Sequence, residues 1–418
     1  MMKNPEYLTR RDFTTSLLAS GGLLAAISQS AIPAAIETNP SPATHADIGT
    51  LYEEILTIAS QCEYPLSFLK KDYTNVQEYR ITVQQKIHEL LHYNPPAVDF
   101  HPEIVERWET DTYIRETVLL NTTPWFRIPA YVLIPKNFTG KRPGIVDLHC
   151  HAGAFVFGKE KVMPMPTPHP ALTDLKDSVY DGKSTSEQLV QRGYVVISID
   201  RFYFGDRRTL FDDLNTLGMD LSTYSVEDIR TANRRAARGE STLTKSLFWA
   251  GTTWQGIGCW DDMRTVEYLT TRPEVDSGRI GCLGISMGAD RTNYLCALDD
   301  RIQCAVTVGW MATLRPLIQA HIDTHSFSHF LPGMTNFLDL PDMIGAFTPK
   351  PLLVQQCTRD GLYTLESMKE ACSKIEQIYA KAGASDKYQY KFYDQEHRFS
   401  LEMQEDAFNW LDRHLNPE

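Results

Sequence analysis

The sequence predicts an α/β fold: a mostly parallel, eight-stranded sheet with helices on both faces and an N-terminal helical extension. Two observations predict it. Short apolar segments of strand length recur from residue 116 towards the C-terminus, and helical patterns separate most of them. The segments are apolar almost throughout, as expected of parallel strands buried on both faces. With 418 residues, 42% of them hydrophobic, the chain can bury a large core.

Residues 1–35 have the features of an export signal. Arg10 and Arg11 precede Phe13, and a mildly apolar run of about a dozen residues leads to small residues ending at Ala35. The paired arginines resemble the twin-arginine signal of bacteria. An uncleaved membrane anchor is the alternative, but the run is shorter than the roughly 20 residues that span a bilayer. We therefore expect export by the twin-arginine machinery and a periplasmic or secreted location.

Residues 36–110 are predicted to be a linker and a helical extension. Residues 36–48 are rich in Pro, Ser, Thr and Ala. Apolar residues then recur at three- and four-residue steps, including Val83 and Ile87, until Asn94-Pro95-Pro96 ends the helix.

The main domain is predicted over residues 111–418 and opens with an antiparallel hairpin. Its expected strands are 116–120, 130–134, 143–148, 194–199, 280–283, 305–308, 352–354 and 388–392. Two insertions, 159–186 and 206–252, follow strand ends, where α/β proteins build their sites. We expect both near the active site.

Charge and cysteine usage exclude several classes of protein. Forty-one basic against 53 acidic residues give a net charge of −12 without a basic cluster, so a nucleic-acid partner is not expected. The eight cysteines show no C-x-x-C spacing, and most lie in or beside apolar stretches, where free thiols behave as small hydrophobes. The oligomeric state stays open.

The segment Gly284-Ile285-Ser286-Met287-Gly288 carries the strongest chemical signal. It matches G-x-S-x-G between a predicted strand and a predicted helix. In that context the glycines permit a strained turn that exposes the serine hydroxyl above the sheet. The sequence therefore predicts Ser286 as a nucleophile.

A serine nucleophile needs a base and a group that orients the base. Asp360 and His397 lie just past the last two predicted strands, in the order Ser, Asp, His. The oxyanion hole is expected from the backbone N–H groups of Met287 and of Ala152 or Gly153. Gly153 is favoured because it lacks a Cβ and lets a ligand approach closely.

From about Arg115 onward the chain resembles an α/β-hydrolase of the acetyl-xylan-esterase-like and dienelactone-hydrolase-like group. The resemblance rests on the serine motif, Asp360, His397 and three further segments: 128–135, Phe204-Gly205-Asp206-Arg207 and Trp260-Asp261-Asp262-Met263-Arg264. It implies an exported serine hydrolase that cleaves carboxylic esters of small molecules or carbohydrates, acetylated carbohydrate among them, without a metal or cofactor. Dienelactone hydrolases proper have cysteine in place of Ser286, and the loop reads His-Ala-Gly rather than His-Gly-Gly.

Several sequence motifs also allow alternative interpretations. Asp147-Leu148-His149-Cys150-His151 matches the D-x-H-x-H opening of metal-dependent amidohydrolases, and His321, His325 and His329 would share one helix face and could bind zinc. A basic face at Arg230, Arg234, Arg235 and Arg238 would suit an acidic sugar, although a solvated helix is the simpler interpretation. At the level of function, the alternatives are a serine peptidase of the oligopeptidase type and a non-catalytic binding protein on a hydrolase scaffold.

Overall fold

The computed structural model describes residues 46–415 except 71, 137 and 211–219. The expected signal peptide, residues 1–35, lies outside the described residues. The described residues fall within one compact unit, Thr44–Glu418. None of its described helices combines the length and apolar character needed to cross a membrane.

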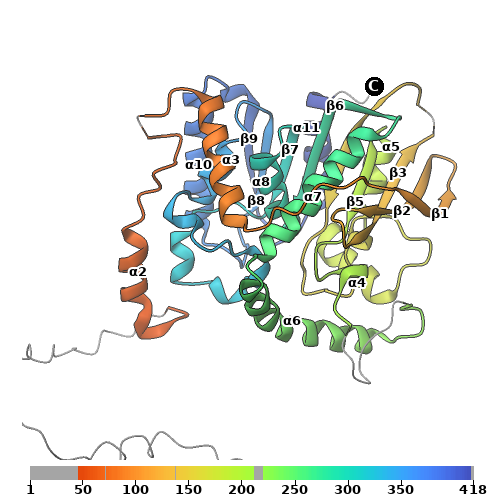
Figure 1. Ribbon diagram of the computed structural model, residues 1–418, viewed down its shortest axis with the longest axis horizontal. Coiled ribbons are helices and arrows are strands. Elements are labelled where there is room, and N and C mark those ends of the chain that lie inside the picture. Colours follow the sequence, from red (N-terminus) through yellow and green to blue (C-terminus); the bar gives the residue numbers. More distant parts are fainter. Residues whose placement is uncertain (1–45, 71, 137, 211–219, 416–418) are drawn as a thin grey trace, which may run out of the picture. The chain divides into compact units, whose positions relative to one another are not determined.

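A mixed sheet of nine strands forms the centre of this unit (Figure 1), in the order β1-β2-β3-β5-β4-β6-β7-β8-β9. The pairs β1–β2, β2–β3 and β3–β5 are antiparallel, and the remaining pairs are parallel. The strands are β1 (Glu103–Glu109), β2 (Tyr113–Asn121), β3 (Arg127–Pro135), β4 (Arg142–Leu148), β5 (Val195–Ile199), β6 (Val275–Ile285), β7 (Ile302–Val308), β8 (Leu352–Cys357) and β9 (Tyr388–Tyr393). This confirms the predicted fold class.

The sheet has one strand more than the eight predicted, namely β1. Its sequence, Glu-Ile-Val-Glu-Arg-Trp-Glu, is largely exposed, so it lacks the apolar signature used to find the other strands. Pairing with β2 holds it at the sheet edge, where charged residues are common. The sheet therefore begins before residue 111, inside the stretch predicted as linker and helical extension.

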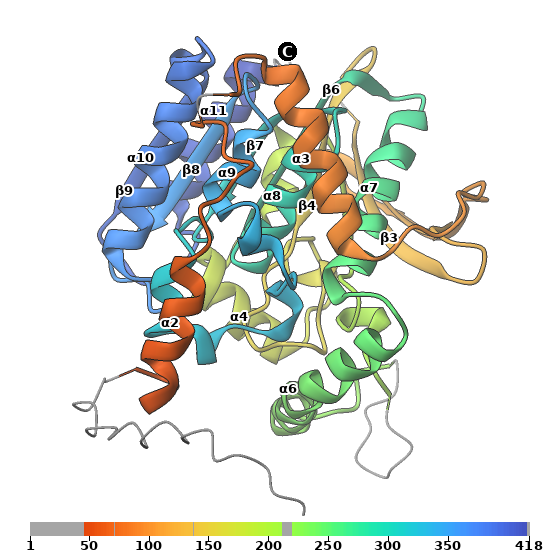
Figure 2. The ribbon, with the colours of Figure 1, turned by 60° about the vertical axis from the view of Figure 1, so that its left-hand side comes forward.

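Helices cover both faces of the sheet (Figures 1 and 2). One face packs against α3, α7, α8 and α10, and the other packs against α5 and α11. The helices are α2 (Tyr52–Ser60), α3 (Val76–Leu91), α4 (Pro170–Tyr180), α5 (Thr185–Gln191), α6 (Val226–Trp249), α7 (Trp254–Thr271), α8 (Met287–Leu298), α9 (Leu340–Gly345), α10 (Leu365–Lys381) and α11 (Leu401–Leu415).

The N-terminal helices are integrated with the main domain. Asn75 caps α3 by accepting from two backbone N–H groups, and the buried face of α3 joins the main core. Tyr79 donates a hydrogen bond to the carbonyl oxygen of Asp342 at 2.6 Å, and the Ser67 hydroxyl donates to the Asp342 carboxylate at 2.5 Å. The extension thus shares the core of the sheet domain.

Candidate active site

Ser286 occupies a strained turn between β6 and α8. Its φ of 59° and ψ of −124° lie outside the regions that L-residues normally adopt. The flanking glycines permit this turn. A Cβ on Gly288 would lie 1.9 Å from the carbonyl oxygen of Leu148, and one on Gly284 would lie 2.5 Å from the Gly288 backbone. The Ser286 N–H donates to the carbonyl oxygen of Val308 at 2.9 Å, which fixes the turn against β7.

Asp360 and His397 form a close pair beside this turn. Nδ1 of His397 lies 2.6 Å from Oδ2 of Asp360, whose side chain is fully buried. The backbone N–H of Leu362 donates to the other carboxylate oxygen at 2.9 Å, so the carboxylate is held at both oxygens. Nε2 of His397 is buried and has no hydrogen-bond partner among the described residues. This nitrogen is therefore available to a ligand.

Ser286 and His397 line the same pocket, which has a volume of about 620 Å³. The loop after β4, helix α6 and the segment 323–329 also contribute residues to this pocket. Gly309 gives the imidazole its room, because a Cβ there would lie 2.9 Å from Cε1 of His397. Both predicted insertions reach the pocket: 159–186 through Val179 on α4, and 206–252 through Ala237 and Glu240 on α6.

The loop after β4 presents backbone N–H groups to this pocket. The N–H of Gly153 is engaged, since it donates to Nδ1 of His151 at 2.9 Å. No hydrogen bond within the described part of the chain engages the N–H of Ala152. The N–H of Met287 opens α8 and has no partner inside the helix. Of the two candidates for a second oxyanion donor beside the Met287 N–H, the geometry thus favours the N–H of Ala152 over that of Gly153.

Lys161 fixes this loop from inside the protein. Its ammonium donates to the carbonyl oxygens of Cys150 and His151, each at 2.9 Å. Burial lowers the pKa of Lys161 to about 8. The sequence did not indicate this role, because a lysine in a Pro- and Lys-rich insertion reads as a surface residue.

A second carboxylate–histidine pair was not foreseen, and its histidine, His329, lines the same pocket. Nδ1 of His329 lies 3.0 Å from Oδ2 of Asp290, which is on α8 one turn after Ser286. Glu240 accepts from the Ser326 hydroxyl at 2.7 Å and lies 3.3 Å from Nε2 of His151. Burial raises the pKa of Glu240, but these hydrogen bonds outweigh it and leave the pKa below its usual value.

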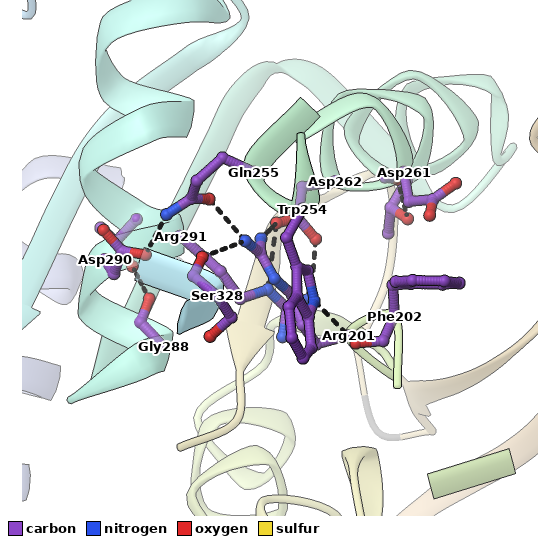
Figure 3. A network of polar contacts seen from close by, with 12 residues as sticks. Arg201, Phe202, Trp254, Gln255, Asp261, Asp262, Gly288, Asp290, Arg291 and Ser328 are labelled. Carbon is purple, nitrogen blue, oxygen red and sulfur yellow. Dashed lines mark hydrogen bonds and ion pairs between the residues drawn. The ribbon is translucent and has the colours of Figure 1, made fainter. Parts of the chain in front are cut away.

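Figure 3 shows the polar network behind Asp290. Gln255 donates to the Asp290 carboxylate at 2.6 Å and accepts from the Arg201 guanidinium at 2.5 Å. Arg291, the residue after Asp290, donates to Asp262 at 2.6 Å. Asp262 belongs to the motif Trp260-Asp261-Asp262-Met263-Arg264, so part of the sequence resemblance is a buried framework beneath the site.

The zinc alternative for His321, His325 and His329 is not borne out. The segment forms separate short 3₁₀ turns rather than one helix, so the three imidazoles do not share a face. His325 Nδ1 lies 2.8 Å from the carbonyl oxygen of His321, and the His329 ring lies against Trp310 at 4.1 Å. These side chains form a pocket wall.

The amidohydrolase alternative also fails on geometry. Asp147 accepts from the hydroxyls of Thr185 and Ser186, each at 2.6 Å. His149 accepts from the N–H of Arg201 at 3.0 Å, while His151 contacts Glu240. The three side chains of the motif therefore have separate partners.

Among the described residues, one acidic cluster has the spacing for a metal: Glu160, Asp200 and Asp206. The ammonium of Lys159 already contacts these carboxylates, lying 2.7 Å from both Asp200 and Asp206. Burial alone would lower the pKa of Lys159, but Asp200 and Glu160 raise it well above its usual value. The lysine supplies the positive charge that a metal would bring.

Comparison with known proteins agrees with this geometry. The chain is 26% identical over 285 residues to the "Putative hydrolase YtaP" of Bacillus subtilis (strain 168), covering 67% of this chain and 81% of that protein. Its fold is similar to that of a "putative acetyl xylan esterase" from Bacteroides fragilis NCTC 9343 (TM-score 0.63, 18% identity, 83% of this chain and 84% of that one).

A glucuronoyl esterase from Solibacter usitatus is similar in fold as well (TM-score 0.55, 12% identity, 81% and 92% of the two chains). The profile of the Abhydrolase family matches residues 44–414. With the nine-stranded sheet and the serine turn after β6, this match shows that the chain is an α/β-hydrolase and belongs to the Abhydrolase family.

Proposed function

We propose that this protein is a serine esterase with Ser286, His397 and Asp360 as its catalytic triad. One observation carries the proposal: a serine on a strained strand-to-helix turn shares a pocket with an imidazole whose Nδ1 is held by a buried carboxylate and whose Nε2 is unengaged. This is the arrangement that activates a hydroxyl for attack on a carbonyl.

Hydrolysis then proceeds in two halves. The Ser286 oxygen forms a bond to the ester carbonyl carbon while its proton passes to Nε2 of His397. As the tetrahedral intermediate collapses, the bond to the alcohol oxygen breaks and that oxygen takes the proton from His397. A water molecule then forms a bond to the carbonyl carbon of the acyl-enzyme and gives a proton to Nε2 of His397. As this second intermediate collapses, the bond to the Ser286 oxygen breaks, that oxygen takes the proton back from His397, and the acid leaves. Asp360 keeps the ring in the required tautomer and stabilises its charged form.

The developing negative charge on the carbonyl oxygen needs hydrogen-bond donors. The N–H groups of Met287 and Ala152 are the candidates, since the Gly153 N–H is already engaged. Such a donor stabilises a transition state by about 3 kcal/mol. We place the oxyanion hole between the start of α8 and the loop that Lys161 holds.

The substrate class follows from the pocket and from the named relatives. Glu240, Ser326 and His151 offer hydrogen bonds that suit a hydroxylated alcohol such as a sugar. Two proteins of similar fold carry the names "putative acetyl xylan esterase" and "Glucuronoyl Esterase". We therefore propose esterified carbohydrate as the substrate, and export by a twin-arginine signal to the periplasm or the medium.

Replacing the nucleophile tests the proposal. Ser286→Ala should lower turnover of p-nitrophenyl acetate by at least about 10⁴-fold, and wild type should be labelled at Ser286 by a fluorophosphonate probe. Because the change removes one oxygen atom, the melting temperature should stay close to that of wild type. A matched ester and anilide pair should show cleavage of the ester only. Activity that survives in Ser286→Ala would overturn the proposal.

A further inference from the structure

A second cavity, of about 500 Å³, borders the pocket that contains Ser286. Most of its lining is apolar and includes Tyr294, Leu317, Leu331, Met334 and Leu340. Trp310, His325, Phe327 and His329 line both cavities and so form the partition between them. The volume is within the roughly 300–1,000 Å³ typical of small-molecule sites.

The N-terminal extension completes this cavity. Ala59 on α2, Cys62 and Tyr64 line it, and α2 contacts the turn at 315–318, which Figure 2 shows beside it. Arg315 donates to the carbonyl oxygen of Cys62 at 2.8 Å, which secures the junction. The helical extension therefore has a structural role, because it closes a cavity next to the catalytic pocket.

Two charged groups, Asp290 and Arg315, lie among the mostly apolar lining of the cavity. The Arg315 guanidinium donates to the carbonyl oxygen of Cys62, while its Nε is buried and has no partner among the described residues. Both hydrogen bonds to Oδ2 of Asp290 come from within the protein, from Gln255 and His329. Burial raises the pKa of Tyr64 to about 12, so its hydroxyl is neutral at physiological pH. A cavity with such a lining favours an apolar ligand over water.

Three of the four rings of the partition pack closely on one another, and the fourth, Phe327, is more exposed. His329 is held by Asp290 and lies against Trp310, with ring centroids 4.1 Å apart. His325 is packed as well: its Nδ1 lies 2.8 Å from the carbonyl oxygen of His321, and its ring lies 5.1 Å from that of Trp310 and 5.2 Å from that of Tyr363. Burial lowers the pKa of His325 to about 4, so it is neutral. Phe327, by contrast, is 45% exposed. An acyl chain that enters the second cavity would therefore pass beside Phe327.

We infer that this apolar cavity is the acyl pocket, and that the enzyme prefers esters of acids with an extended apolar chain over acetates. The inference rests on the proposed esterase function. His397 lines only the pocket of Ser286, and the departing alcohol must stay beside His397 to receive its proton. The alcohol therefore occupies the polar pocket, and the acyl chain extends into the apolar cavity.

Acyl-chain dependence tests the assignment. With p-nitrophenyl acetate, butyrate and octanoate, kcat/KM of wild type should rise about fourfold for each methylene that enters the cavity. Ala59→Phe and Leu317→Phe, which fill the cavity, should each lower kcat/KM for octanoate at least tenfold while that for acetate stays within about twofold. Ile58→Phe is the matched control, because Ile58 is 60% exposed on the same helix and does not line the cavity.

Binding of octanoate, measured by titration calorimetry, gives a readout independent of turnover. Octanoate should bind wild type and Ile58→Phe equally and Ala59→Phe at least tenfold more weakly. A preference for acetate, or filling variants that hydrolyse octanoate normally, would overturn the acyl pocket and leave the esterase intact. If Ala59→Phe weakened octanoate binding but left the ester specificity unchanged, the cavity would be a separate ligand site. That result would also overturn the assignment of the cavity as the acyl pocket. Absence of any ester hydrolysis by wild type would instead refute the esterase proposal.

Discussion

Three histidines of one pocket, His151, His329 and His397, each lie beside a carboxylate, so single contacts decide which of them can act as the base. Asp360 holds His397 at 2.6 Å, and Asp290 holds His329 at 3.0 Å. Of these carboxylate-paired histidines, only His397 has an Nε2 that is buried and has no partner among the described residues, and Gly309 leaves space for its ring. His329 instead stacks on Trp310 and forms part of the partition.

Substitution of each histidine should separate these roles. His397→Gln should lower kcat for p-nitrophenyl acetate by at least about 10³-fold and abolish fluorophosphonate labelling, because Ser286 loses its base. His329→Gln should alter kcat by less than about tenfold and retain labelling. Steady-state kinetics and labelling of both variants provide the measurement. Equal losses in the two variants would contradict the assignment of His397.

Gly309 is predicted to act through the position of His397. In Gly309→Ala the new Cβ would lie 2.9 Å from Cε1 of His397, at a φ of +62°. The displaced ring should reduce kcat by about 10- to 100-fold. Gly383→Ala is the control, since it carries similar strain at φ +70° but has open space around the Cβ. Both variants should lose about 1 kcal/mol of stability, and only the first should lose activity; comparable kinetics for the two would disprove the effect.

At the scale of elements, the loop after β4, where we propose the oxyanion hole, is held by a lysine from the following insertion. Residues 152 and 153 adopt consecutive left-handed conformations, with φ of 50° and 63°. Such a backbone persists only when its surroundings hold it. Lys161 does this with two hydrogen bonds, and the buried network of Arg201, Gln255 and Asp290 supports the opposite side of the pocket.

Lys161→Met tests the contribution of this clamp. The methionine keeps most of the side-chain volume but cannot donate to the carbonyl oxygens of Cys150 and His151. We expect kcat to fall at least about tenfold with a smaller change in KM, because the loop contributes mainly to the transition state. Lys387→Met, at an exposed surface lysine, is the control. A KM effect without a kcat effect would show that the loop serves substrate binding instead.

At the scale of the whole molecule, stability depends on a carboxyl group at the centre of the sheet. Asp147 lies on β4 and accepts from Thr185 and Ser186 at the start of α5. Burial raises its pKa to about 6, an effect that these hydrogen bonds only partly offset. Its folded-state pKa is thus above the unfolded value of about 3.9. The folded protein binds the proton more tightly, so this group's contribution to stability falls as pH rises from about 4 to about 6.

Asp147→Asn removes this titration. Between pH 4 and pH 7 the free energy of unfolding of wild type should fall relative to that of the variant by about 2–3 kcal/mol. Urea denaturation of both proteins at the two pH values measures the difference. Because other groups titrate identically in both proteins, they cancel. A difference that does not change with pH would show that Asp147 keeps an ordinary pKa.

Much of this architecture was predictable because its signals are local. The strand-to-helix turn at Ser286 needs glycines at 284 and 288, and burial on both sheet faces makes the parallel strands continuously apolar. The edge strand β1 was not predicted, because pairing with β2 stabilises it and it has no apolar face that a sequence pattern would show. Our proposal of Ala152 in place of Gly153 could not be made from the sequence, because it depends on where His151 directs its ring.

The sequence by itself therefore determined the α/β fold and the order of serine, aspartate and histidine along the chain, since turn chemistry and hydrophobic periodicity act over a few residues. Only the tertiary structure decided the pairing of Asp290 with His329, the clamp by Lys161 and the apolar cavity closed by α2. These features join side chains that lie from ten to more than two hundred residues apart, and no local pattern encodes contacts that arise only when the chain packs.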